Sequence, residues 1–181
     1  MVSRTIPVDT FDLVIFGATG DLARRKILPG LFRRYASGQM PEEARLIGAA
    51  RSELDAAGYR AEVRAALHEF ADADSLDDET VDGFLGHVNF VTVDATGDSG
   101  WAQLRDLLRP GVVRAFYFSV APSLFGEIAE RLMTKGLADE DSRIVVEKPF
   151  GRDLASARAL NAALATYFDE GQIYRIDHYL G

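Results

Sequence analysis

Short apolar runs alternate with longer amphipathic stretches throughout this sequence, and that alternation limits the fold more than any other feature. Strands are predicted at residues 12–17, 45–50, 87–93, 112–120, 142–147 and 172–176. Helices are predicted between them, at residues 27–35, 53–70, 99–108, 124–135 and 153–168. Strands that are apolar almost throughout are buried on both faces. We therefore expect an α/β fold, a doubly wound and mostly parallel sheet of the Rossmann type with helices on both faces.

The composition agrees with one soluble domain of this kind. The chain has 181 residues, 48% of them hydrophobic and 27% charged, which is enough for a core of its own. It has no cysteine, which excludes disulfides and thiolate-ligated metals, and we expect no metal site. No apolar run approaches the roughly 20 residues of a membrane helix, and no secretory signal is recognisable. We expect a cytoplasmic protein without a membrane partner.

The charges are unevenly distributed. A net charge of −8 argues against a general nucleic-acid binder. Residues 72–82 carry acids and no base, which predicts a solvated loop. Residues 22–41 carry bases and no acid, and they include Pro29 within the first predicted helix. Because proline has no N–H for the helix ladder, a kink or a short non-α turn is predicted there.

A glycine-containing loop lies between the first strand and the first helix, and it consists of Gly17, Ala18, Thr19, Gly20, Asp21, Leu22 and Ala23. A doubly wound fold binds a dinucleotide at this position. Gly17 would permit a tight turn, Gly20 close approach to a pyrophosphate, and Ala23 close packing of helix on strand. The spacing differs from the commoner G-x-G-x-x-G, so a turn without a ligand is the alternative. The position in the first β-to-α connection favours dinucleotide binding.

Arg51 and Ser52 follow the second predicted strand. A site specific for NAD carries an acid here for the ribose 2′-hydroxyl, and an acid would repel a 2′-phosphate. An arginine can instead bind that phosphate through two hydrogen bonds. The alternative is an ordinary exposed arginine. Together with the glycine loop, Arg51 and Ser52 predict NADP as the cofactor.

Further polar residues follow the other strands, and parallel topology would bring them to the same edge of the sheet. They are Ser119, Ser123, Lys148, Asp177 and His178. Lys148 precedes Pro149 in a loop suited to a substrate hydroxyl or phosphate, with a surface lysine as the alternative. Asp177 and His178 are adjacent, and adjacent residues of an extended chain face opposite ways, which disfavours a direct pair.

Five segments together resemble the glucose-6-phosphate dehydrogenase family, in its N-terminal coenzyme-binding part. They are residues 17–23, 48–52 (GAARS), 116–122 (FYFSVAP), 147–151 (EKPFG) and 175–181 (RIDHYLG). The resemblance covers the whole chain. It implies NADP-dependent oxidation of glucose 6-phosphate to 6-phosphoglucono-lactone, the first oxidative step of the pentose phosphate pathway.

The resemblance also implies roles for particular residues. The glycine loop and Arg51 would hold the cofactor, with Arg51 on its 2′-phosphate. Lys148 would contact both the substrate and the cofactor, and Pro149 would shape that loop as the cofactor docks. His178 and Tyr179 would bind the sugar phosphate. Asp177 would orient a catalytic base.

The family's catalytic histidine belongs to a second domain, and no residue of this chain corresponds to it. We therefore expect residues 1–181 to be an NADP-binding domain whose catalytic partner domain is absent from this chain, and to be poorly active or inactive alone. A non-catalytic NADP-binding module, acting as a sensor or partner subunit, is the alternative. An extended short-chain reductase also fits the glycine loop, but it leaves Lys148, Asp177 and His178 unexplained. The full-length family is expected to form homo-oligomers, which need not hold for this chain.

Overall fold

The computed structural model describes residues 8–147 and 150–176. The strands are β1 (Phe11–Phe16), β2 (Arg45–Ala50), β3 (Val88–Thr92), β4 (Val113–Phe118), β5 (Arg143–Glu147) and β6 (Ile173–Ile176). The α-helices are α1 (Leu28–Ala36), α2 (Ala56–Phe70), α3 (Asp78–Leu85), α4 (Trp101–Leu107), α5 (Phe125–Thr134) and α6 (Leu154–Ala165). A π-helical turn, η1 (Ala23–Ile27), precedes α1, and short 3-10 turns are η2 (Ala73–Ser75), η3 (Pro122–Leu124) and η4 (Glu170–Gln172).

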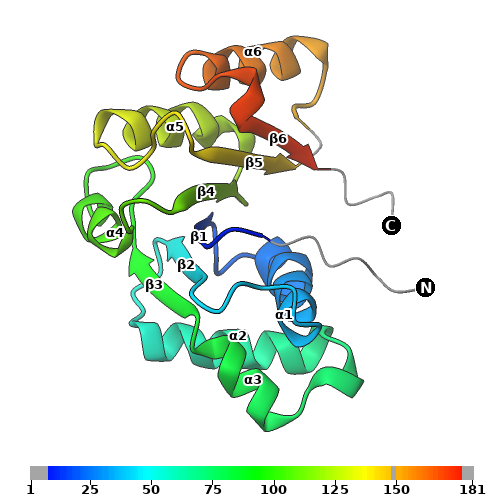
Figure 1. The fold of residues 1–181 in the computed structure, drawn as a ribbon. Coiled ribbons are helices and arrows are strands. Elements are labelled where there is room, and N and C mark those ends of the chain that lie inside the picture. Colours follow the sequence, from blue (N-terminus) through cyan, green and yellow to red (C-terminus); the bar gives the residue numbers. More distant parts are fainter. Residues whose placement is uncertain (1–7, 148–149, 177–181) are drawn as a thin grey trace.

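All six strands are parallel and form one sheet in the order β3-β2-β1-β4-β5-β6 (Figure 1). The chain runs outward from β1 to β3, returns through α4 to the other side of β1, and continues outward to β6. The direction of winding therefore changes between β1 and β4, where doubly wound sheets bind ligands. The doubly wound parallel fold predicted from the alternation of apolar runs and helices is confirmed.

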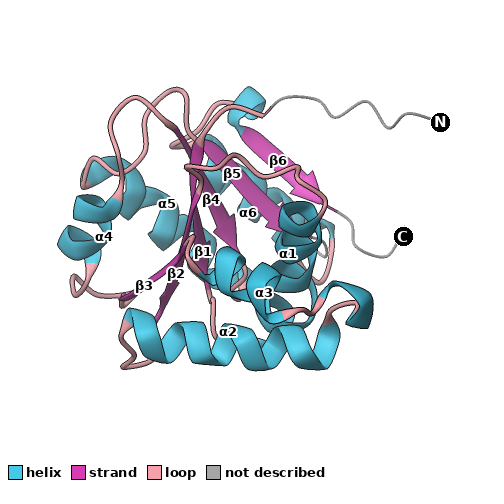
Figure 2. Cartoon of the chain, turned by 60° about the horizontal axis from the view of Figure 1, so that its bottom comes forward, coloured by secondary structure: helices cyan, strands magenta, loops and turns pink. Residues whose placement is uncertain are grey.

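Helices cover both faces of the sheet (Figure 2). Leu13 and Ile15 of β1 lie on the face covered by α1 and α2, on which α3 packs in turn, whereas Val14 and Phe16 lie on the face covered by α4, α5 and α6. All four side chains are buried, because alternate residues of a strand point to opposite faces and both faces are covered. No helix in residues 8–147 and 150–176 is long and apolar enough to cross a membrane.

Aromatic side chains pack beneath the carboxyl ends of the central strands. The ring centroid of Phe16 lies 5.7 Å from that of Trp101 and 5.8 Å from that of Phe118. Phe118 contacts Phe125 of α5 edge-on at 5.3 Å. Edge-to-face contacts of this kind fix ring positions as well as burying area. They give the loops above β1 and β4 a rigid base.

The acidic segment 72–82 is not the solvated loop that its charge predicted. Its second half enters α3, which begins after Asp77. The Asp77 carboxylate accepts hydrogen bonds from the N–H and hydroxyl of Thr80, at 2.9 and 2.7 Å, and so caps the helix. Val81 and Phe84 are fully buried, and the ring of Phe84 packs edge-on against Phe32 of α1, with centroids 5.4 Å apart. Acids in a first helical turn are stabilised by the helix dipole, so this charge run marks the start of a helix.

The irregularity predicted at Pro29 is confirmed. The helix that follows the glycine loop contains the π-helical turn η1, which ends just before α1, and Pro29 lies in the first turn of α1. Because proline has no N–H, Pro29 cannot donate the hydrogen bond that a regular α-helix would need at this position. The wider π-helical turn before it changes the hydrogen-bonding pattern where that donor is missing.

Candidate functional site

The glycine loop turns directly above the end of β1. Gly17 has a φ of +79° and donates its N–H to the carbonyl of Ala49, at 2.9 Å. A Cβ at Gly17 would lie 2.0 Å from the carbonyl oxygen of Ser119, so no larger residue fits. The N–H of Gly20 closes the turn on the carbonyl of Gly17, at 3.0 Å. The loop thus presents bare backbone beyond β1, the surface on which a pyrophosphate can lie.

Two buried alanines pack this loop against the rest of the domain. Ala18 and Ala23 are fully buried, and the packing role predicted for Ala23 agrees with that burial. The carbonyl of Ala18 accepts a hydrogen bond from the Tyr59 hydroxyl of α2, at 3.3 Å. Tyr59 reaches the loop by crossing Gly48 of β2, where a Cβ would approach its ring to 2.6 Å. A glycine within β2 therefore makes room for the side chain that supports the loop.

The end of β2 lies beside the loop, as the topology predicts. The hydroxyls of Thr19 and Ser52 are hydrogen-bonded at 3.1 Å, and the Ser52 carbonyl accepts from the Thr92 hydroxyl at the end of β3, at 2.8 Å. Arg51, between β2 and Ser52, is exposed. These contacts hold Arg51 at the rim of the cavity that the glycine loop borders.

Residues 94–96 after β3 line the same cavity, although they were not predicted as site residues from the sequence. Hydrogen bonds from the N–H and hydroxyl of Thr96, with a smaller contribution from the Arg51 charge, lower the pKa of Asp94. The indole N–H of Trp101 donates to the Asp94 carbonyl, at 3.0 Å, and fixes the loop. Their position after a parallel strand was the available signal, since every such strand end reaches this edge.

Two cavities meet at the end of β4. The first, about 540 Å³, extends from Arg51 and the glycine loop to Ala121. The second, about 400 Å³, extends from Asp21 and Leu22 to Glu147 of β5. The two share a border formed by Gly20, Ser119, Val120 and Ala121. Together they form a trough across the ends of β3, β2, β1, β4 and β5.

Ionisable groups along the second cavity are paired. Asp21 accepts a hydrogen bond from Arg25 one turn later, at 2.7 Å. Glu147 accepts the hydroxyl of Tyr117 from the neighbouring strand. Burial, together with this hydrogen bond, raises the pKa of Tyr117, so its phenol remains protonated and donates. The basic residues after the loop are therefore partly neutralised, since Arg24 also pairs with Glu69 of α2, at 3.6 Å.

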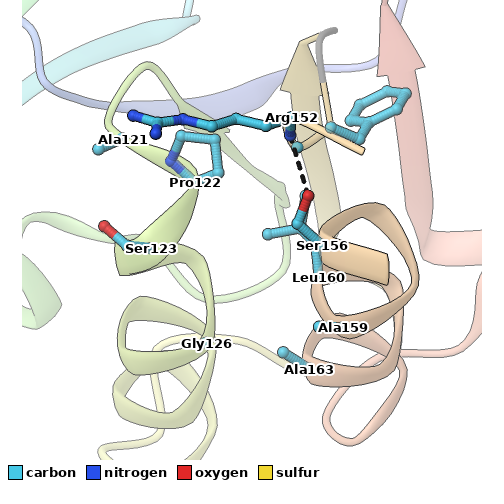
Figure 3. Close-up of a pocket in the computed structure, with 11 residues that line it drawn as sticks. Ala121, Pro122, Ser123, Gly126, Arg152, Ser156, Ala159, Leu160 and Ala163 are labelled. Atoms are coloured by element: carbon cyan, nitrogen blue, oxygen red, sulfur yellow. Dashed lines mark hydrogen bonds between the residues drawn. The ribbon is translucent and has the colours of Figure 1, made fainter. Parts of the chain in front are cut away.

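A third cavity, about 690 Å³, lies between the amino-terminal ends of α5 and α6 (Figure 3). Ser123 borders this cavity and neither of the other two, so the structure separates it from Ser119. Ala159 and Ala163 of α6 face Gly126 of α5 across the gap (Figure 3). The N–H of Arg152 donates to the hydroxyl of Ser156, at 2.9 Å, which orders the start of α6.

The predicted residues Lys148, Pro149, Asp177, His178 and Tyr179 lie outside the described residues. Of the other predicted residues, the structure brings Thr19, Arg51 and Ser52 to one cavity with Gly17 and Gly20. Asp21 and Leu22 line the adjoining cavity. Residues 8–147 and 150–176 contain no cluster of three or more acids and histidines able to hold a metal ion.

A doubly wound sheet with a glycine turn after β1 and a trough beyond the strand ends defines a dinucleotide-binding domain. The backbone at Gly17 and the arginine at the trough's rim both fit a dinucleotide phosphate. The chain belongs to the glucose-6-phosphate dehydrogenase family: residues 14–181 match the family described as "Glucose-6-phosphate dehydrogenase, NAD binding domain". Its cofactor class is a nicotinamide dinucleotide.

Relatives and solved structures agree with this assignment. The chain is 50% identical over 181 residues to a glucose-6-phosphate 1-dehydrogenase of Mycolicibacterium smegmatis, covering 97% of this chain and 37% of the relative. Its identity to the Rhizobium meliloti enzyme of that name is 46%, covering 100% of this chain and 37% of the relative. The crystal structure of the Mycobacterium avium enzyme superposes with a TM-score of 0.86 at 34% identity, covering 95% of this chain and 37% of that one. A glucose-6-phosphate dehydrogenase solved with its substrate glucose-6-phosphate superposes with a TM-score of 0.84 at 33% identity, covering 99% of this chain and 38% of that one.

The chain thus spans about 37% of the length of the curated relatives it matches.

Proposed function

We propose that this chain binds NADP and supplies the coenzyme domain, with part of the substrate site, of an enzyme that oxidises glucose 6-phosphate to 6-phosphoglucono-lactone. The observation that carries the proposal is the position of Arg51, which lines one cavity with the glycine loop. The names of the relatives support the reaction. We also propose that the full-length protein acts in the cytoplasm as a homo-oligomer, at the first oxidative step of the pentose phosphate pathway.

The described residues would act by binding and orientation. Backbone N–H groups where the helix begins after Gly20 would donate to the diphosphate, because the first N–H groups of a helix have no partner within it. The guanidinium of Arg51 would hold the 2′-phosphate, with the Ser52 hydroxyl beside it. The chemistry that the bound cofactor would supply is acceptance of a hydride from C1 of the sugar. The trough across β1, β4 and β5 would then set where that ring lies relative to the substrate.

The substrate contacts that we propose involve residues outside the described part of the chain. Lys148 and Pro149 follow β5 directly in the sequence, next to the second cavity's Glu147. We propose that Lys148 contacts both substrate and cofactor, and that His178 and Tyr179 bind the sugar phosphate. Asp177 would position the base that takes the proton of the C1 hydroxyl, a step that contributes roughly 10²–10⁴-fold in enzymes of this kind.

The experiment that tests the cofactor assignment is Arg51→Ala, with Arg33→Ala on the exposed surface of α1 as the matched control. Loss of a charge-assisted contact to the 2′-phosphate should weaken NADP binding by about 10–100-fold. NAD has no such phosphate, so its affinity should stay within about twofold. Isothermal titration calorimetry with both nucleotides measures this. An equal loss for NAD and NADP would show that Arg51 does not recognise the 2′-phosphate.

A further inference from the structure

Ser119 lies at the point where the winding of the sheet reverses. It is the first residue after β4, and its N–H donates to the carbonyl of Phe16, at 2.9 Å. Its own carbonyl lies so close to Gly17 that no Cβ fits between them. The backbone of Ser119 is therefore held from two sides by the end of β1.

The hydroxyl of Ser119 is buried and has no hydrogen-bond partner among residues 8–147 and 150–176. It is the one side-chain oxygen or nitrogen in that part of the chain with both properties. Thr19 and Ser52 nearby satisfy each other instead. Buried polar groups in native proteins almost always have a partner, so an unpaired hydroxyl in a ligand-binding trough indicates a partner that arrives with the ligand.

Ser119 also borders both cavities of the trough. Arg51 marks the first cavity as the end that would hold the 2′-phosphate, and Glu147 lies in the second cavity, next to Lys148 in the sequence. A dinucleotide bound by Arg51 and the glycine loop must cross the end of β4 to reach the second cavity. The part that crosses is its nicotinamide mononucleotide half, which carries phosphate and ribose oxygens. A serine hydroxyl can donate to either kind of oxygen, and it can accept from a ribose hydroxyl.

We propose that the Ser119 hydroxyl binds the nicotinamide mononucleotide half of the cofactor, and so fixes the position of that half in the second cavity. This proposal rests on the proposed function, because it takes the ligand to be a nicotinamide dinucleotide. It assigns Ser119 a role distinct from that of Arg51. Arg51 discriminates between NADP and NAD, whereas Ser119 contacts a part that the two cofactors share.

The test is Ser119→Ala in the full-length protein, with Ser123→Ala as the matched control on the third cavity. We expect Ser119→Ala to weaken NADP and NAD by the same factor, about tenfold for one lost hydrogen bond to a charged or polar oxygen. Binding of adenosine 2′,5′-bisphosphate, which lacks the nicotinamide half, should not change. Ser123→Ala should change none of the three affinities.

A second measurement separates this role from a structural one. In the ligand-free protein the variant removes a buried hydroxyl that has no partner among the described residues, so its Tm should equal or exceed that of the wild type. The rise in Tm on adding NADP should be smaller than in the wild type. A lower Tm without ligand would overturn the proposal, since it would show that the hydroxyl supports the fold.

The remaining outcomes are also distinct. Unchanged NADP affinity in Ser119→Ala would overturn the Ser119 proposal alone and indicate a bound water as the hydroxyl's partner. An equal loss of NADP and adenosine 2′,5′-bisphosphate would overturn it as well, because the effect would not be confined to the nicotinamide half. Wild-type protein that binds neither NADP nor the bisphosphate would overturn the proposed function itself.

Discussion

Position 17 requires glycine for two reasons, its backbone conformation and the space around it. Its φ of +79° is one that L-residues rarely adopt, and the carbonyl of Ser119 occupies the space where a side chain would begin. The sequence predicted the tight turn correctly from the position of Gly17 after an apolar strand. The identity of the blocking residue could not be predicted, because β4 lies about a hundred residues further along the chain. Only the pairing of β1 with β4 brings the two together.

Gly17→Ala should therefore destabilise the protein strongly, by more than about 3 kcal/mol, because both backbone strain and steric overlap oppose it. Gly38→Ala is the matched control: Gly38 has a similar φ of +73° but open space around its Cβ position. Strain alone should cost the control about 1 kcal/mol. Urea unfolding of both variants gives the difference, and similar losses in the two would mean that the Ser119 contact is unimportant.

Tyr59 leads to a prediction about alkaline pH. Burial raises the pKa of Tyr59 well above the ordinary value for tyrosine, with the nearby Glu62 adding to the effect. A group whose pKa is raised on folding contributes stability that is complete below the unfolded pKa and is lost as the pH rises through the folded pKa. The free energy of unfolding should thus decline above about pH 10. Tyr117, whose pKa is raised in the same direction, should add to the decline.

In Tyr59→Phe the alkaline decline should become shallower. At neutral pH the variant should lose about 1 kcal/mol, because the carbonyl of Ala18 loses its donor. Tyr174→Phe, which removes an exposed tyrosine hydroxyl on β6, is the control. Urea titrations between pH 7 and pH 11 measure both effects, and identical slopes for wild type and Tyr59→Phe would contradict the prediction.

At the scale of the elements, the sequence predicted every strand and most helices from hydrophobic periodicity, with ends displaced by capping residues. Asp55 illustrates this, since its carboxylate accepts the N–H of Gly58, at 2.7 Å, and starts α2 later than the periodicity alone suggested. The missed helix, α3, has its own signal in Val81, Phe84 and Leu85, which share one helical face. The prediction of a solvated loop followed the acidic residues of this segment instead of these three apolar ones. Helix propensity is a weak prior when burial decides the outcome.

An ion pair at the opposite edge of the sheet joins three elements. Asp12 of β1 is fully buried, and it accepts hydrogen bonds from the N–H and the guanidinium of Arg109, at 2.6 to 3.0 Å. Arg109, between α4 and β4, also donates to the carbonyl of Glu43 before β2, at 2.7 Å. The pair therefore fixes the starting ends of β1, β2 and β4 relative to one another.

Asp12→Ala should lower the free energy of unfolding by about 3–5 kcal/mol, because it leaves the Arg109 charge without its partner. The double variant Asp12→Ala with Arg109→Met should recover part of that loss, since no unpaired charge remains. NADP affinity of the folded protein should be unchanged, because the pair lies at the other end of β1 from Gly17. Denaturant unfolding measures the stability of both variants, and calorimetry measures their NADP affinity. A double variant no more stable than Asp12→Ala would contradict the explanation by an unpaired charge.

At the scale of the whole molecule, the trough forms because the ends of β1 to β5 meet at one edge of the sheet, each contributing a few residues. Position after a strand was enough to predict that Thr19, Arg51 and Ser119 would gather there. It was not enough to separate Ser123, which the turn η3 carries round to the cavity between α5 and α6. The direction of the Ser123 side chain depends on the three-residue turn η3, and the order of the strands gives no information about that turn.

The polypeptide of residues 1–181 should bind NADP yet turn over glucose 6-phosphate very slowly. We propose that the general base lies in another domain of the full-length enzyme, and loss of a general base alone costs roughly 10²–10⁴-fold. Absorbance of NADPH at saturating glucose 6-phosphate measures turnover, and calorimetry measures binding in the same preparation. Full activity of this polypeptide would contradict the expectation that the base lies elsewhere.

The sequence by itself determined the class of fold, the dinucleotide loop and the place of Arg51, because all three depend on local patterns: hydrophobic period, glycine spacing and order along the chain. The tertiary structure decided what surrounds them. It placed the Ser119 carbonyl against Gly17, brought Tyr59 across Gly48 to the loop, and left the Ser119 hydroxyl buried without a described partner. These facts join residues far apart in the chain, and steric contact across a packed interior cannot be read from either residue alone.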